Sequence, residues 1–385
     1  METKKTNLSV AYNLISYHDT KAEGTFVYMR RLFEQMQECD LSMFHFIVYV
    51  QVHINLDNFC FPKRCSHEII RVPKLKNSIF RILFEQTIFY FYLKRSRILF
   101  SPSSISMPLF SRSYKIQVIH DIIPFIFSRK YSWFRQWYIK MMTKCVTRIC
   151  NHIITVSQNS KRDIIKYLKI DPAKISIIYN FIPPSDPPVI KRLNLEINTE
   201  VKAVDGTIID INKIFFLTVA ALQPAKNIEG LLRAFRKFNK THQNYYLYIV
   251  GNKGRSYKQM YMLAEELQVS ENILFTGFVD DYTLSKLYEK CLGVAYFSFY
   301  EGFGVPPLEG FYHGKACVAS NISSIPEVVG NAGILANPYD IDDMANAMEQ
   351  FINQKLSLEK NIQAQINMFN PKEQTNKFLE LLCPF

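Results

Sequence analysis

Two glutamates with seven residues between them, Glu301 and Glu309, stand in the stretch of this chain that is richest in potential chemistry. An apolar run at 292–297 precedes them, and a turn with Gly302 and Gly304 leads into a predicted helix. Carboxylates accept hydrogen bonds, while free backbone N–H groups in such a turn and at a helix start donate them. This combination suits a ligand with both hydroxyls and phosphates, and a nucleotide sugar has both.

Two further candidate sites follow predicted strands. Lys226 lies between an apolar run at 215–222 and a predicted helix, where its ammonium and the helix dipole would both attract a diphosphate. His120 and Asp121 end the buried strand predicted from Ile116. Because the carboxyl ends of parallel strands meet at one edge of a sheet, such side chains can line the same crevice.

The elements that must position these residues alternate along the chain. Strands alternating with helices predict a parallel, doubly wound α/β sheet. Both halves of the chain show this rhythm, so we expect two Rossmann-like domains that face one another across a cleft. In the second half the predicted strands are 215–222, 245–250, 272–278, 292–297 and 316–320, with helices near 228–240, 256–268, 282–290 and 306–313.

A proline-rich stretch without clear periodicity separates the two halves. We therefore predict an acceptor-binding domain at 1–180, a linker at 181–212 and a donor-binding domain at 213–371. For 372–385 we predict a C-terminal helix that returns to the first domain. A length of 385 residues and a hydrophobic content of 48% suit two packed domains.

Composition also limits the compartment and the cofactors. The chain starts without the apolar segment of a signal peptide, and its longest apolar candidate, 79–92, is interrupted by charged residues. The eight cysteines lack C-x-x-C pairs and metal-site spacing. We therefore expect a cytoplasmic protein with reduced thiols and no bound metal or other cofactor.

The net charge of +12 is unevenly distributed. Residues 1–180 hold 27 Lys and Arg against 12 Asp and Glu, whereas residues 181–385 hold 19 against 22. This asymmetry favours a polyanionic partner for the first half. No nucleic-acid motif accompanies it, and aromatic residues are interleaved with basic ones along 74–97. We therefore expect peripheral docking on the anionic inner face of the cytoplasmic membrane.

Four strings extend the pattern to most of the chain and resemble retaining GT-B glycosyltransferases of family 4. The string around Glu301 and Glu309 resembles the E-x7-E motif of that family, and residues 319–330 match the family segment on the C-terminal side of that motif. The His-Asp-Ile-Ile-Pro string at 120–124 and residues 155–163 match as well. The resemblance implies a GT-B fold and a retaining transfer of a hexose from an NDP-sugar, with no metal required. It also implies front-face substitution, in which the acceptor hydroxyl gives its proton to the leaving phosphate.

The resemblance assigns roles to individual residues. Lys226 would hold the diphosphate, Glu301 the sugar hydroxyls, Glu309 the ribose diol, and His120 the donor sugar near the reacting carbon. The implied catalytic residues are His120, Asp121, Lys226 and Glu301. The implied donor-binding residues are Gly24, Thr25, Lys226, Asn227, Gly251, Gly277, Phe278, Glu301, Gly302, Phe303, Gly304, Val305 and Glu309.

The chain departs from the family pattern at three places. Alanine stands at 221 and 225, where a phosphate-binding Arg is usual, a single glycine, Gly24, replaces a double glycine, and Phe181 replaces a hinge glycine. Two alternatives therefore stay open, a GT-B nucleotide-sugar epimerase and a non-catalytic nucleotide-sugar-binding protein. Family members with a string like that at 120–124 resemble mannosyltransferases and related enzymes. If the chain is a transferase, the resemblance therefore favours GDP-mannose as the donor, with a UDP-hexose as the second choice. The expected acceptor is a glycan or a lipid-linked glycan of surface polysaccharide, lipopolysaccharide or capsule.

Overall fold

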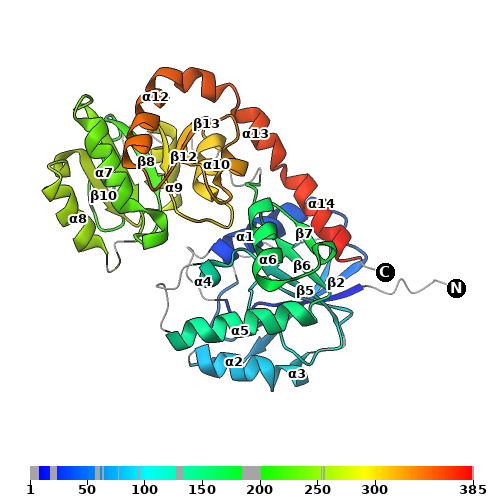
Figure 1. The fold of residues 1–385 in the computed structure, drawn as a ribbon. Coiled ribbons are helices and arrows are strands. Elements are labelled where there is room, and N and C mark those ends of the chain that lie inside the picture. Colours follow the sequence, from blue (N-terminus) through cyan, green and yellow to red (C-terminus); the bar gives the residue numbers. More distant parts are fainter. Residues whose placement is uncertain are drawn as a thin grey trace. The chain divides into compact units, whose positions relative to one another are not determined.

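The computed structural model describes residues 8–17, 24–56, 61–62, 65–76, 78–93, 96–126, 133–183, 201–252, 254 and 256–383. The chain forms two compact units, the first made of Met1–Ser185 with Pro371–Phe385 and the second of Asp186–Asn370 (Figure 1). Each unit contains one parallel sheet with helices packed on it. This confirms the prediction of two α/β domains with doubly wound parallel sheets.

The first unit has a seven-stranded sheet in the order β3-β2-β1-β4-β5-β6-β7. Every pair of neighbouring strands is parallel. The strand order reverses between β1 and β4, and ligands of such sheets bind outside the carboxyl ends of strands at the reversal. The strands are β1 (Leu8–Asn13), β2 (Phe44–Gln51), β3 (Ser66–Val72), β4 (Ile98–Ser101), β5 (Tyr114–Ile119), β6 (His152–Thr155) and β7 (Ile175–Ile177).

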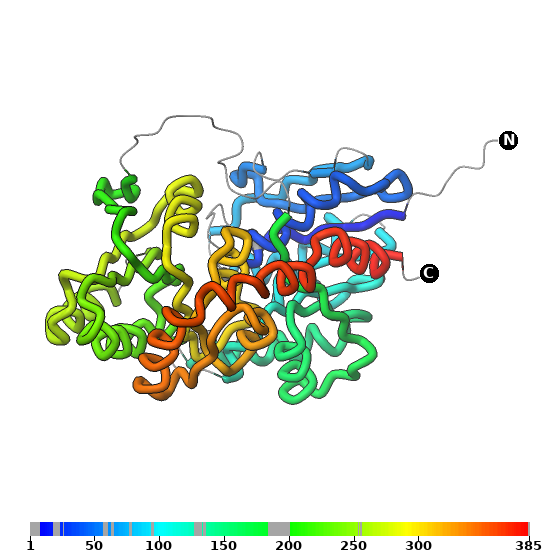
Figure 2. Tube along the Cα trace, turned by 90° about the horizontal axis from the view of Figure 1, so that it is seen from above, coloured from blue at the N-terminus to red at the C-terminus, as the bar shows by residue number. Residues whose placement is uncertain are grey.

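Helices cover this first sheet, and a helix from the C-terminal end of the chain is one of them. Phe378 of that helix, α14, packs edge-on against Phe100 of β4 at 5.2 Å between ring centroids, and α14 also contacts α1 (Figure 2). Within the stretch 78–92, the chain forms two short helices, α2 and α3. The helices are α1 (Gly24–Met36), α2 (Ser78–Gln86), α3 (Phe89–Tyr92), α4 (Ile123–Ile126), α5 (Trp133–Ile149), α6 (Gln158–Leu168) and α14 (Pro371–Leu381).

The second unit has a six-stranded parallel sheet in the order β10-β9-β8-β11-β12-β13. Its strands are β8 (Ile214–Val219), β9 (Tyr245–Val250), β10 (Ile273–Gly277), β11 (Gly293–Tyr296), β12 (Cys317–Ser320) and β13 (Gly333–Ala336). Its helices are α7 (Ile228–Asn239), α8 (Tyr257–Glu266), α9 (Asp281–Lys290), α10 (Val305–Tyr312), α11 (Ile325–Val329), α12 (Ile341–Glu359) and α13 (Ile362–Met368).

The strand order of the second unit brings two distant loops together. The order reverses between the neighbouring strands β8 and β11, which are 70 or more residues apart in the chain. The loop after β8 carries Lys226, and the loop after β11 carries Glu301. Both loops leave the same edge of the sheet, so the topology itself places these two residues near one another.

The segment predicted as linker, 181–212, is described only in part, because 184–200 lie outside the described residues. Residues 201–212 pack within the second unit. Ile209 is buried, Lys202 and Ile208 form an isolated antiparallel bridge, and the Val204 N–H donates to the Phe278 carbonyl at 3.1 Å. These residues therefore form part of the second unit's fold.

The first unit contains a buried acid, Glu85, whose neighbours do not fully offset the cost of burying its charged form. Glu85 of α2 is 1% exposed. Burial raises the pKa of Glu85 to about 7, although the charge of Arg81 acts in the opposite direction. Tyr138 of α5 faces the same carboxyl group. The neutral form is therefore favoured inside the unit.

This burial predicts a pH-dependent stability. From about pH 4.5 to about pH 7 the unfolded chain has released the Glu85 proton that the folded chain still holds, so rising pH favours unfolding. Glu85→Gln removes this contribution. The difference in the free energy of unfolding between the variant and the unmodified protein should therefore shift by about 2–3 kcal/mol in favour of the variant from pH 5 to pH 8. Urea unfolding of both proteins at the two pH values measures the gain. A difference between the proteins that does not change with pH would contradict the expectation.

Candidate functional site

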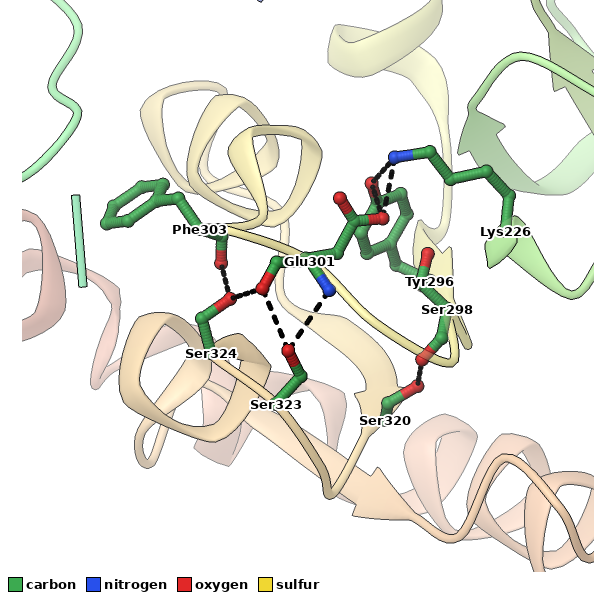
Figure 3. Close-up of polar contacts among 8 residues, drawn as sticks. All are labelled: Lys226, Tyr296, Ser298, Glu301, Phe303, Ser320, Ser323 and Ser324. Carbon is green, nitrogen blue, oxygen red and sulfur yellow. Dashed lines mark hydrogen bonds and ion pairs between the residues drawn. The ribbon is translucent and has the colours of Figure 1, made fainter. Parts of the chain in front are cut away.

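Lys226, Tyr296 and Glu301 form a compact polar cluster at the carboxyl edge of the second sheet (Figure 3). The Lys226 Nζ donates to Glu301 Oε1 at 2.6 Å and to the Tyr296 hydroxyl at 3.2 Å. The Tyr296 hydroxyl donates to the same Glu301 Oε1 at 2.8 Å. The Lys226 ammonium and the Tyr296 hydroxyl thus share one oxygen of the Glu301 carboxylate, and the structure brings two of the four predicted catalytic residues, Lys226 and Glu301, into direct contact.

Serine hydroxyls hold the backbone that carries Glu301. The Glu301 N–H donates to Ser323 Oγ at 3.0 Å, and the Ser323 and Ser324 hydroxyls lie 2.8 and 2.9 Å from the Glu301 carbonyl oxygen. Ser324 Oγ also lies 2.7 Å from the Phe303 carbonyl oxygen. Figure 3 shows these contacts converging on the loop from below the side-chain cluster. The loop is therefore fixed independently of any ligand.

The side chains of Lys226 and Glu301 are 24% and 12% exposed. Burial by itself would lower the pKa of the Lys226 ammonium, but the Glu301 carboxylate and the Tyr296 hydroxyl raise it above its ordinary value. Burial, followed by the charge of Glu301, raises the pKa of Tyr296 as well. Lys226 is therefore a permanent cation at physiological pH, and Tyr296 stays protonated.

Asn227 fixes the loop that presents Lys226. Its backbone is left-handed, with φ 51°, and its side-chain oxygen accepts from the Gly230 N–H to cap α7. Its Nδ2 donates to the carbonyls of Phe297 and Pro338 at 3.1 and 2.9 Å. Asn227 was predicted to bind the donor, but its side-chain bonds all serve the fold, so we assign it a positioning role for Lys226.

Glu309 lies on α10, the helix that follows the turn with Gly302 and Gly304, and it is not part of the cluster of Lys226, Tyr296 and Glu301. Glu309 is the fifth residue of α10, which begins at Val305, so it lies just beyond the first turn of the helix. Its Oε2 accepts from the buried Tyr288 hydroxyl of α9 at 2.8 Å. The carboxylate is half-buried.

The turn after Glu301 is shaped by close packing. Gly304 has φ +108° and caps α10, and a Cβ there would lie 2.6 Å from Ile325 Cδ1. The Phe303 side chain is buried and packs on Phe369 at 5.2 Å, so only its backbone can take the predicted ligand contact. Gly302 is half-buried between them. In this turn, therefore, backbone groups rather than side chains are available for the predicted contact with the donor.

The neighbouring loops after β9 and β10 carry the other predicted donor-binding residues. A Cβ on Gly251 would overlap the Ala220 carbonyl, so this glycine permits the close approach of two strand ends. Gly277 ends β10 with φ +76°, and its carbonyl accepts from the Gly251 N–H at 3.0 Å. The Phe278 ring is 51% exposed and can lie against a flat ligand group.

The remaining predicted residues belong to the first unit. The Asp121 carboxylate accepts from the Ile123 N–H at 2.9 Å at the start of α4, which is a structural bond. His120 directly follows β5, and its carbonyl accepts from Ser160 Oγ at 3.2 Å. Gly24 and Thr25 begin α1. A Cβ on Gly24 would meet no atom within 4 Å, so packing does not require a glycine there.

Sequence reasoning missed Tyr296, although it stands at the end of the strand that leads to Glu301. Its only sequence signal is a hydroxyl-bearing aromatic side chain as the last residue of an otherwise apolar strand. No group of three or more His, Cys, Asp or Glu side chains placed to hold a metal ion occurs in the described part of the chain.

Comparisons with known proteins bear on both units. A model of the family "Glycosyl transferases group 1" matches residues 205–368, and a model of "Glycosyltransferase Family 4" matches residues 60–186. Among relatives, the serotype-specific mannosyltransferase WbdA of Escherichia coli is 28% identical over 263 residues, covering 64% of this chain and 30% of WbdA. The O-antigen chain mannosyltransferase RfbU of Salmonella typhimurium is 27% identical over 263 residues, covering 68% of each chain. The chain thus spans about a third of WbdA's length.

Solved structures share the fold along the whole chain. The structure of Anabaena HepE in complex with UDP and glucose superposes with a TM-score of 0.72 at 16% identity, covering 98% of this chain and 100% of HepE. WaaG, a glycosyltransferase involved in lipopolysaccharide biosynthesis, superposes with a TM-score of 0.72 at 14% identity, with 98% and 100% covered. These likenesses confirm the predicted GT-B fold.

The polar cluster predicts an asymmetric response to mutation. Glu301→Gln leaves the shielded Lys226 ammonium without its counter-charge, and we expect a loss of about 1–3 kcal/mol in the free energy of unfolding. Adding Lys226→Met should recover most of that loss, because no unpaired charge then remains. Urea unfolding measures both variants.

A control comes from the exposed pair Arg233–Glu229 in the same unit, whose side chains are 42% and 58% exposed. Glu229→Gln should change stability by less than about 0.5 kcal/mol. If Glu301→Gln cost no more than this control, or if the second substitution deepened the loss, the pair would not be shielded as described.

Proposed function

Since the chain belongs to the group 1 glycosyltransferases of the GT-B fold, we propose that it transfers a hexose from a nucleotide sugar to a glycan acceptor in surface polysaccharide assembly. The observation that carries the proposal is the cluster of Lys226, Glu301 and Tyr296 at the reversal point of the second sheet. A permanent cation there, beside a carboxylate, suits a ligand with phosphates and sugar hydroxyls.

Mannose, donated by GDP-mannose, is our first proposal for the transferred sugar. WbdA is named as a serotype-specific mannosyltransferase, and RfbU is named as an O-antigen chain mannosyltransferase. HepE, with UDP and glucose in its structure, supports a UDP-hexose as the second proposal. The acceptor we propose is a glycan, lipid-linked while the polysaccharide is assembled.

The hydrogen-bond capacity of the cluster leaves both charged groups free to act. An ammonium has three N–H donors, and Lys226 uses two of them on Glu301 and Tyr296. The third can donate to a phosphate oxygen. Glu301 bonds these partners through Oε1, and its Oε2 takes no bond from the described residues. Oε2 can accept sugar hydroxyls, and Glu309 can accept from the ribose diol.

In the proposed reaction the bond between the anomeric carbon and the diphosphate oxygen breaks on the face where the acceptor oxygen attacks. The acceptor hydroxyl gives its proton to the departing phosphate, and the configuration at the anomeric carbon is retained. Lys226 stabilises the charge that grows on the diphosphate. Glu301 orients the sugar, and its carboxylate, tied to the ammonium, is a weak nucleophile. Lys226 and the helix-start N–H groups supply the positive charge, so we propose that no metal ion is required.

We propose a cytoplasmic location with the first unit docked on an anionic membrane. No helix in the described ranges is long and apolar enough to span a bilayer. Three helices that pack around one core, α2, α3 and α5, expose a set of large apolar side chains: Ile79, Phe80, Leu83, Ile88, Tyr90, Phe91, Trp133, Trp137 and Met141. Basic residues of α5, Lys144 and Arg148, are exposed as well. Aromatic rings with nearby cations suit the headgroup layer.

One residue of the predicted membrane-facing segment has a different role. Arg81 was expected to contact lipid phosphates, but its Nε is buried and its charge acts on Glu85 inside the unit. Lys94 and Arg95 of the same segment lie outside the described residues. The apolar side chains therefore carry more of this proposal than the basic ones.

A panel of nucleotide sugars tests the proposed function through release of the nucleoside diphosphate. We expect release from GDP-mannose or, failing that, from a UDP-hexose. Lys226→Ala should lower kcat about 100-fold or more while weakening donor binding less, because the diphosphate charge grows in the transition state. Lys237→Ala, which removes an exposed lysine of α7 that pairs with Asp342, should leave kcat unchanged. No release from any donor, or full activity of Lys226→Ala, would contradict the proposal.

Co-sedimentation with vesicles tests the membrane proposal. The protein should bind phosphatidylglycerol vesicles at 0.1 M salt and not phosphatidylcholine vesicles, and 1 M salt should weaken the binding because the Debye length falls from about 10 Å to about 3 Å. Phe80→Ser with Phe91→Ser should reduce binding severalfold. Leu356→Ser, at an equally exposed position of the second unit, should not. Equal binding to both vesicle types, or binding to neither, would contradict the membrane proposal. The basic residues of the first unit would then form a solvated surface without a membrane role.

A further inference from the structure

Two side chains of the first unit, Tyr28 and His120, are in contact at the carboxyl edge of its sheet but form no hydrogen bond with each other. Tyr28 lies in the second turn of α1, and His120 directly follows β5. Their ring centroids are 5.2 Å apart with an interplanar angle of 83°, an edge-to-face contact. The two rings therefore hold one another in a fixed orientation.

Both rings carry a buried polar atom with no hydrogen-bond partner in the described ranges, the Tyr28 hydroxyl and the His120 Nε2. Nearly all buried polar atoms in proteins have a partner, so two neighbouring exceptions call for an explanation. The backbone elements that carry them are fixed: Ser160 Oγ donates to the His120 carbonyl, and Asp121 caps the next helix. The exceptions thus occur on an ordered framework.

The hydrogen-bond roles of the two atoms can be assigned. The His120 ring bonds to the Pro102 backbone, which offers only a carbonyl, and Nε2 has no partner. The proton is therefore on Nδ1, and Nε2 presents a lone pair. Burial lowers the pKa of His120 to about 4, so the ring is neutral at pH 7. Burial also raises the pKa of Tyr28, which keeps its hydroxyl proton.

We propose that Tyr28 and His120 together bind one free hydroxyl of a substrate sugar, which donates to Nε2 and accepts from the Tyr28 hydroxyl. The proposal rests on the proposed function and makes Tyr28 a specificity-determining residue of the first unit. Only a group that both donates and accepts satisfies the two atoms. A phosphate, a carboxylate, an ether or an acetamido carbonyl would leave Nε2 without a proton donor, and a site built around such a bond rejects the wrong group strongly.

Tyr28→Phe removes the hydroxyl and keeps the ring that packs on His120. Its matched control is Tyr12→Phe on β1, because the Tyr12 hydroxyl is also buried without a described partner but its ring packs among Phe33, Phe46 and Phe100. With the nucleotide sugar that the unmodified protein turns over best, kcat/KM should fall about 3- to 10-fold in Tyr28→Phe. Tyr12→Phe should stay within about twofold.

Monodeoxy analogues of the substrates identify the hydroxyl. The analogue that lacks the bound hydroxyl should have a lower kcat/KM than the full substrate in the unmodified protein, and Tyr28→Phe should not lower that kcat/KM further. For every other analogue, Tyr28→Phe should lower kcat/KM as much as it does for the full substrate. If this pattern appears in donor hydrolysis without acceptor, the hydroxyl belongs to the donor. If it appears only in transfer, with deoxy acceptors, it belongs to the acceptor.

Equal kcat/KM of Tyr28→Phe and the unmodified protein would overturn the inference, and so would a loss of the same size with every analogue. Thermal unfolding of both variants distinguishes a folding defect from a lost contact. If no nucleotide sugar is turned over, the proposed function fails separately. Saturation-transfer NMR with GDP-mannose then replaces turnover, and sugar-proton contacts that persist unchanged in Tyr28→Phe would overturn the inference.

Discussion

A lysine and a glutamate that are both largely shielded from water, Lys226 and Glu301, impose the strictest requirement on the second unit. Removing two charges from water is costly, and the cost is offset only when the pair is close and well hydrogen-bonded. The 2.6 Å contact and the bond from Tyr296 meet that requirement. The same arrangement makes Lys226 a permanent cation, which is the property that a diphosphate site needs.

Much of the surrounding structure serves this contact. Strand order places β8 beside β11, so that loops far apart in sequence leave the sheet together. Asn227 ties the first loop to the second through the Phe297 carbonyl, and the Phe299 N–H donates to the Ala225 carbonyl at 2.9 Å. Ser323 then fixes the backbone of Glu301. Ala225 is itself buried between these loops, at one of the two positions where the family pattern has an arginine.

The sequence predicted the fold better than it predicted side-chain contacts. Alternating apolar runs specify strands and helices, and they placed Lys226 and Glu301 in loops that follow strands, as the structure does. They do not specify strand order, so the ion pair between these residues and the role of Tyr296 could not be predicted. Arg81 shows the same limit, since it belongs to the basic and aromatic stretch 74–97 that was predicted to face the membrane, whereas its Nε is buried and its charge acts on Glu85. Side-chain pairing depends on packing between elements, which periodicity within one element does not contain.

The most direct test of the account tracks the anomeric carbon through the reaction. Donor labelled with carbon-13 at that position is mixed with the protein and an acceptor glycan, and the products are observed by NMR. We expect release of nucleoside diphosphate and a new glycoside signal with the anomeric configuration of the donor. A glycoside of inverted configuration would contradict the proposed front-face reaction. A free 2-epimer of the sugar, or binding without any product, would contradict glycosyl transfer itself.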